Sequence, residues 1–141
     1  MANIIYNNAK SALNAYPWTS GTWKILLTTS SYTPDIDAHV YVSDVTNELV
    51  GTGYVRKTLA GQAVSIDTGN DRADFKANNV TWTAIQAGTA AKAIVYRFVT
   101  VDGDSPIIAC LDITPATITN GGDFTLEWDG QLVNGRLFSI G

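Results

Sequence analysis

The chain contains very few of the residues on which covalent cross-linking and metal binding depend. Among its 141 residues there is one cysteine, Cys110, and one histidine, His39. A single thiol cannot form an internal disulfide, and one histidine with one cysteine is too small a ligand set for a structural zinc site. A chain of this length can bury roughly two thirds of its unfolded surface, so we expect a domain held by its own core, with no metal and no other cofactor.

Charge is also scarce, and long apolar segments are absent. Nine Lys and Arg stand against thirteen Asp and Glu, and the basic residues are scattered apart from the pair Arg56-Lys57. Because nucleic-acid binding normally needs a basic patch, nucleic acid is not an expected partner. No run reaches about eighteen apolar residues, and the N-terminus lacks a basic segment followed by an apolar one. We therefore expect no membrane association and synthesis in the cytoplasm.

The residues of common catalytic sites do not occur in a suitable pattern. A serine-histidine-aspartate triad would have to use His39, which we interpret as a loop histidine that bonds its own turn. The two glutamates, Glu48 and Glu127, are interpreted as solvated or salt-bridged surface groups. A small glycosidase is the alternative, because the separation of two carboxylates cannot be seen in a sequence. Residues 67–74 lack the spacing of a calcium loop and favour an ordinary Asx-rich turn. The expectation is a protein that is not an enzyme, without catalytic residues.

Short runs of β-branched and aromatic residues are abundant, and turn-forming residues separate most of them. Asp102-Gly103, between two such runs, is the clearest hairpin signal. Helix is predicted only at 8–15 and at 38–45, the second with Asp37 as its N-cap. The predicted strands cover residues 23–29, 50–59, 63–67, 80–84, 91–101, 107–113, 124–128 and 136–140.

Alternation within these runs indicates how the strands pack. Phe124, Leu126 and Trp128 fall on one side of their strand, whereas residues 94–99 are apolar on both sides except for Arg97. The second pattern is typical of a central strand covered by another sheet. We predict an all-β fold with little helix: an antiparallel β-sandwich or jelly roll that forms a single domain over residues 1–141.

Several segments match, in order, one known group of proteins. The most informative covers residues 30–39 and 43–54: a strand end, a polar loop broken by Pro34, and a second strand in which Gly51 and Gly53 allow a bend or bulge. Further matches lie at residues 6–10, 18–30, 79–84, 105–109 and 121–128. Together these segments resemble a family of small structural proteins from tailed-phage particles. The chain departs from the family at residues 55–61, where Arg56-Lys57 stand in place of a glycine-richer turn.

The resemblance implies a component of the phage head or tail, located in the virion. Our first expectation is a capsid decoration or cement protein that stabilises the head and binds the major capsid protein or other virion proteins. One alternative is a tail or fibre-tip protein that binds a host receptor or glycan. Another is a head-tail adaptor component.

The candidate contact residues lie in and just after the first eighteen residues. This segment has no sustained strand or helix period, which suggests an N-terminal arm over residues 1–18; an edge strand followed by a short helix is the alternative. The aromatic residues here could cover the end of the barrel, contact a neighbouring subunit or stack on sugar. The candidates for a subunit or capsid interface are Ile4, Ile5, Tyr6, Tyr16, Trp18 and Trp23. Three-fold sites on an icosahedral shell favour a homo-oligomer that is a trimer rather than a dimer.

Overall fold

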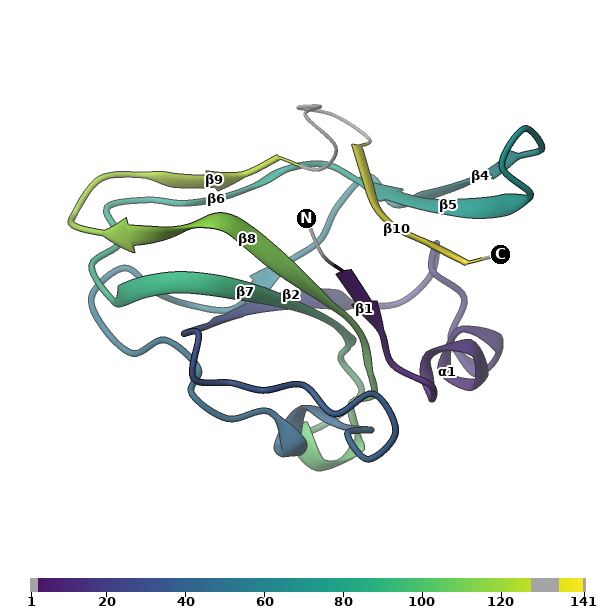
Figure 1. Ribbon diagram of the computed structural model, residues 1–141, viewed down its shortest axis with the longest axis horizontal. Helices are drawn as coiled ribbons and strands as arrows, with labels where there is room; N and C mark the ends of the chain where they lie inside the picture. Colours follow the sequence, from purple (N-terminus) through teal and green to yellow (C-terminus); the bar gives the residue numbers. More distant parts are fainter. Residues whose placement is uncertain (1–2, 128–134, 141) are drawn as a thin grey trace.

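The part of the chain that the structure describes is all-β, with one short α-helix. A computed structural model describes residues 3–127 and 135–140 (Figure 1). The strands are β1 (Asn3–Ile5), β2 (Trp23–Thr28), β3 (Lys57–Thr58), β4 (Ala63–Asp67), β5 (Arg72–Ala77), β6 (Val80–Trp82), β7 (Gly88–Arg97), β8 (Ile107–Thr119), β9 (Phe124–Leu126) and β10 (Gly135–Ile140). The helix α1 spans Ala9–Ala15, and 3-10 turns lie at Val42–Asp44 and Asp102–Asp104.

Every pair of neighbouring strands is antiparallel. Five strands form one sheet in the order β1-β8-β7-β2-β3, three form a second in the order β10-β5-β4, and β6 pairs with β9. The two smaller sheets lie above the five-stranded sheet in the view of Figure 1, with α1 at the side. This arrangement confirms the prediction of an all-β chain with little helix.

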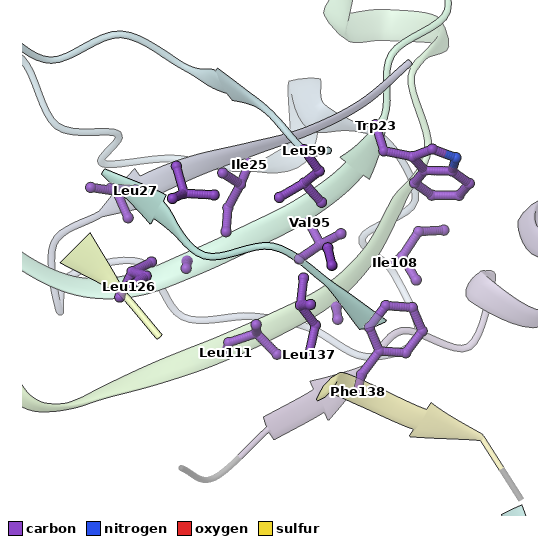
Figure 2. Close-up of a cluster of buried hydrophobic side chains, with 14 of the residues drawn as sticks. Trp23, Ile25, Leu27, Leu59, Val95, Ile108, Leu111, Leu126, Leu137 and Phe138 are labelled. Carbon is purple, nitrogen blue, oxygen red and sulfur yellow. The ribbon is translucent and has the colours of Figure 1, made fainter. Parts of the chain in front are cut away.

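The main hydrophobic core fills the space between the five-stranded sheet and the two smaller sheets. Side chains of β2, β7 and β8 meet side chains of β9 and β10 there, and all are almost completely buried (Figure 2). The residues that show this packing most directly are Leu27, Val95, Ile108, Leu111, Leu126, Leu137 and Phe138. The burial of these side chains supplies most of the driving force for folding.

A second buried cluster covers the opposite face of the five-stranded sheet. Ile94 and Tyr96 of β7 lie in this cluster, whereas Ala93 and Val95 of the same strand lie in the main core. The prediction of a central strand that is apolar on both faces is therefore confirmed. The cover on the second face is not a sheet, because it comes from the N-terminal segment and the long loop after β2, through Tyr6, Tyr32 and Val42.

Two predicted elements are wrong. The predicted helix at 38–45 is reduced to the 3-10 turn Val42–Asp44. Here the Asp44 carboxylate accepts hydrogen bonds from the backbone of Val40 and Tyr41, and Asp35 does the same for the residues that follow it. Such side-chain bonds stabilise turns in competition with a helix. The predicted N-cap Asp37 therefore caps no helix.

The predicted strand at 50–59 is mostly a loop, and only β3 is extended. Gly53 adopts φ +75°, which favours glycine, and a Cβ atom at Gly51 would lie 2.3 Å from the carbonyl oxygen of Gln86. The backbone N–H of Gln86 donates a 2.7 Å hydrogen bond to the carbonyl of Thr52. This close approach to the segment before β7 turns the chain away from a continuous strand.

The other predicted strands are present, β4 with the predicted bounds and the rest with shifted ends, and β5 was missed. β1 is the edge strand named as the alternative to an N-terminal arm; its three residues are too few to show a period. β5 was missed because charged residues alternate with alanine around Phe75, so its strand propensity is low; pairing with β4 and β10 on both sides stabilises it instead. Trp128, predicted to share a face with Phe124 and Leu126, lies outside the described residues.

Candidate interaction surface

Side chains that could bind a metal ion do not cluster in the described part of the chain. Residues 3–127 and 135–140 contain no cluster of three or more His, Cys, Asp or Glu side chains that could hold a metal ion. Cys110 is fully buried, and burial raises the pKa of its thiol to about 11. A buried thiol of high pKa is a weak nucleophile, so Cys110 is a packing residue.

The single histidine belongs to its own loop, as predicted. His39 Nδ1 accepts a 3.1 Å hydrogen bond from the backbone N–H of Asp35 and lies 2.9 Å from the hydroxyl of Tyr32. The Tyr32 hydroxyl lies 2.7 Å from that of Tyr6, and burial raises the pKa of Tyr32 to about 12. Both tyrosines are therefore protonated at neutral pH. They form a chain of hydrogen bonds that ties the N-terminal segment to the loop after β2.

The glutamates also occupy structural positions. Glu48 receives two hydrogen bonds of 2.8 Å from the guanidinium of Arg56 and one of 2.6 Å from the hydroxyl of Tyr54. Arg56 also forms a 2.6 Å ion pair with Asp102 in the turn between β7 and β8. The prediction of a salt-bridged Glu48 and an exposed Glu127 is confirmed. Because Arg56 bonds both oxygens of Glu48 and also pairs with Asp102, it links the loop after β2 to the turn between β7 and β8.

Three of the six candidate contact residues lie inside the core of their own chain. Tyr6, Trp18 and Trp23 are 1%, 2% and 0% exposed. The Trp18 and Trp23 rings lie 4.8 Å apart, and Trp18 also meets Phe75 and Phe138 edge-on. Trp18 and Trp23 cover the end of the core, the first of the three interpretations, and neither is exposed as a platform for a sugar.

The other three candidates, Ile4, Ile5 and Tyr16, are half-buried. β1 pairs with β8 at the edge of the five-stranded sheet, with Ile4 opposite Cys110. The described residues of the first eighteen therefore form the edge strand and short helix that we named as the alternative to an extended arm. Whether another subunit or capsid covers this edge stays a prediction.

A hollow lies beside β1, between the N-terminal segment and the C-terminal strand β10. Its volume is about 350 Å³, and the residues that line it are Ile5, Tyr6, Asn7, Lys10, Ser139 and Ile140. Two of the candidate contact residues, Ile5 and Tyr6, are among them. The contribution of β10 could not be found from the sequence, because only tertiary packing brings residues 139 and 140 to the N-terminal segment.

A second surface, missed by the sequence reasoning, is the apolar face of the β4–β5 hairpin. Val64 and Ile66 lie opposite Phe75 and Ala73 and share one face with them. They are 43% and 73% exposed, because the hairpin extends beyond the main core at the outer end of the molecule (Figure 1). The alternation of residues 63–67 could have indicated a one-sided apolar strand, but not that its apolar side is uncovered.

No family model matches the chain, and no curated protein or solved structure matches it. In the ranges that the structure describes, no helix has both the length and the apolar character needed to cross a membrane.

Proposed function

We propose that the protein is a non-enzymatic structural component of a tailed-phage virion, and that it decorates and stabilises the head. The observation that carries this proposal is the exposed apolar face of Val64 and Ile66 on an edge strand. Soluble proteins usually protect such edges, and an unprotected apolar edge is typical of a surface that another protein covers. The resemblance of the sequence to small structural proteins of tailed phages favours a virion as the assembly to which the protein belongs.

The proposed mechanism is adhesion. A decoration protein spans joints between capsid subunits, and each contact raises the effective concentration for the next, so many weak contacts hold together. The hollow beside β1 would receive the major capsid protein or another virion protein, with Ile5 and Ile140 as its apolar contacts and Lys10 as its charge. We further propose that the chain assembles as a homo-oligomer, with a trimer suited to the three-fold sites of a shell.

We assign the fold to the antiparallel β-sandwich or jelly-roll type. In that arrangement the packed core joins the described strands, and it presents the hollow and the β4 edge in fixed positions. A rigid surface loses little conformational entropy on binding, which favours attachment to a preformed shell.

The copy number of the protein in purified virions of the phage that encodes it tests the proposal. Quantitative mass spectrometry should give hundreds of copies per particle for a head decoration protein, on the order of the number of capsid subunits. A handful of copies would favour the tail-tip or adaptor alternative, and specific binding on a glycan array would support the receptor-binding form of it. Absence from the particle would overturn the proposal.

A further inference from the structure

The outer edge of β4 lacks most of the usual protection against strand pairing, and its one charged residue, Asp67, lies at the end of the strand. β4 is the last strand of the sheet β10-β5-β4, so none of the described strands pairs with the backbone groups on its outer side. Its sequence, Ala63–Asp67, contains no lysine, proline or glycine, and its register with β5 runs through five consecutive pairs without a bulge. Natural edge strands are commonly blocked by such residues or by bulges. The β4 edge is therefore open to another strand.

One face of β4 is apolar and the other is polar. Val64 and Ile66 point to the same face as Phe75 of β5, and this apolar face continues to Phe138 and Ile140 of β10. Ser65 points to the opposite face, where Asp74 and Ser139 are joined by a hydrogen bond of 2.7 Å. Any strand that pairs with β4 must place apolar side chains on the first face and tolerate polar groups on the second.

We propose that β4 pairs with β4 of a second copy of this chain, antiparallel and around a two-fold axis at Ser65. In this register Val64 lies opposite the second copy's Ile66, and Ile66 opposite the second copy's Val64. Ser65 faces its own counterpart, and Asp67 faces the second copy's Ala63. All five residues of each strand are paired, and the two three-stranded sheets become one six-stranded sheet.

The match of β4 with itself is the reason for choosing a second copy as the partner. An axis at residue 64 would place Ile66 opposite Gln62, and an axis at residue 66 would place Val64 opposite Thr68. Either shift would lose one apolar pair. The proposed register also brings no like charges opposite each other. Asp67 of one copy falls beside the second copy's Ala63, whose neighbour on β5 is Lys76. In the described part of the chain the Lys76 ammonium forms no ion pair, so the two charges are complementary across the new contact.

The symmetry of the contact also limits the number of copies that can associate through it. Pairing of β4 with a different edge, such as β10 or β1, would be head-to-tail and could continue into open fibres. Pairing of β4 with itself closes after two copies. The inference rests on the proposed assembly role, since it names one contact by which copies would associate. It uses a different surface from the hollow beside β1, so it is compatible with a trimer formed elsewhere.

Disulfide cross-linking tests the register directly. Residues opposite each other in an antiparallel pair have Cα atoms about 4.5–5.5 Å apart, within the range that a disulfide spans. Because Cys110 is fully buried, Ser65→Cys introduces a single accessible thiol. We expect S65C to form a covalent dimer under mild oxidation. Thr58→Cys, an exposed position on the edge strand β3, is the matched control and should remain uncoupled.

A mixing experiment checks the same register from the other face. V64C and I66C should each cross-link poorly alone and should cross-link to each other when the two variants are mixed. Equal cross-linking of S65C and T58C, or no preference for the mixed pair, would overturn the proposed register.

A substitution pair tests the association without oxidation. Ile66→Lys places a charge in the centre of the proposed contact, whereas Ile118→Lys places it at an equally exposed isoleucine of β8, 72% against 73%. Sedimentation velocity should show that I66K halves the mass of the assembly, or raises its dissociation constant about tenfold or more, and that I118K leaves both unchanged. A wild-type chain that stays monomeric at every accessible concentration would overturn the inference, as would equal effects of the two variants.

The outcomes of this test and of the copy-number test are independent. If I66K has no effect on association but the virion contains hundreds of copies, the two-fold contact is wrong and the decoration role stands. If hydrogen exchange then shows that β4 is protected only on the particle, another virion protein occupies the edge, and the self-pairing is overturned. If I66K and S65C behave as expected while the virion contains no copies, the contact stands and the decoration role is wrong.

Discussion

At the scale of single residues, Trp18 shows how an aromatic side chain near a terminus can be essential to the core. Its ring lies against Trp23, and the stacked pair Phe75 and Phe138 meets it edge-on. Its indole N–H donates a 2.9 Å hydrogen bond to the carbonyl of Lys76 on β5. Trp18 therefore joins the segment before β2 to the three-stranded sheet.

Replacing Trp18 with alanine is expected to destabilise the fold strongly. Removal of a fully buried tryptophan leaves a cavity and typically costs about 3–5 kcal/mol of the free energy of unfolding. Urea denaturation followed by circular dichroism measures this loss. Val50→Ala, at a site 87% exposed, is the control and should change the free energy by no more than about 0.5 kcal/mol. If W18A unfolds with the wild-type midpoint, the core position of this side chain is wrong.

At the scale of elements, the long loop between β2 and β3 contains little regular structure, and an ion-pair network adds to the buried side chains that hold it. Arg56 bridges Glu48 in this loop and Asp102 in the turn between β7 and β8. This network helps to fix the loop against the sheet, so the loop is ordered although it contains almost no strand.

The ion-pair network should make stability depend on pH in the acidic range. Hydrogen bonds from Arg56 hold the pKa of the Asp102 carboxyl below its usual value. A carboxyl with a lower pKa in the folded state contributes stability above its unfolded pKa of about 3.9, and this contribution is lost as the pH falls through the folded pKa. We therefore expect the free energy of unfolding to fall more steeply below about pH 4 in the wild type than in Asp102→Asn.

Urea denaturation at a series of pH values compares the two chains. Other aspartates with lowered pKa, such as Asp44 and Asp104, are present in both chains, so the difference isolates Asp102. Asp71→Asn, an exposed change in the turn of the β4–β5 hairpin, serves as the control. Parallel curves for D102N and the wild type would contradict the prediction.

At the scale of the whole molecule, the two candidate surfaces lie at opposite edges of the three-stranded sheet. The hollow is bordered by β1 of the five-stranded sheet and by β10, whereas the open edge of β4 lies on the opposite side of the three-stranded sheet from β10. Under the proposed function, two separate surfaces would let the molecule link two kinds of neighbour at once. This is the property that a protein spanning capsid joints needs.

Lys10→Glu tests the hollow as the surface that binds the particle. Lys10 is exposed, so the change should leave the fold intact while reversing the charge at the hollow. If the hollow is the contact, we expect the affinity for particles that lack the protein to fall about tenfold or more, equivalent to about 1.4 kcal/mol. Lys57→Glu on β3, at the opposite edge of the five-stranded sheet, is the control. Equal affinity of K10E and the wild type in a pelleting assay would place the contact elsewhere.

The sequence by itself determined the class of the fold and the position of most strands. The clusters of β-branched and aromatic residues predicted β2, β4, β7 and β8, since side-chain period and turn residues are local properties. The apolar run at residues 94–99 correctly indicated that β7 is apolar on both faces. The interpretation of His39 as a residue that bonds its own loop was also correct. β5 was beyond such reasoning, because its strand forms through its neighbours and not through its own propensity.

Tertiary structure alone decided which apolar residues are covered. Trp18 and Ile66 are both apolar residues in or next to short β segments, yet one is buried among aromatic rings and the other is largely exposed. The difference comes from pairings between distant segments, because β10 and β5 cover the end of the core near Trp18 while β4 lies outside it. Burial depends on these long-range contacts. A sequence therefore indicates which side chains can form a contact, and the fold decides which of them remain free to form one with another molecule.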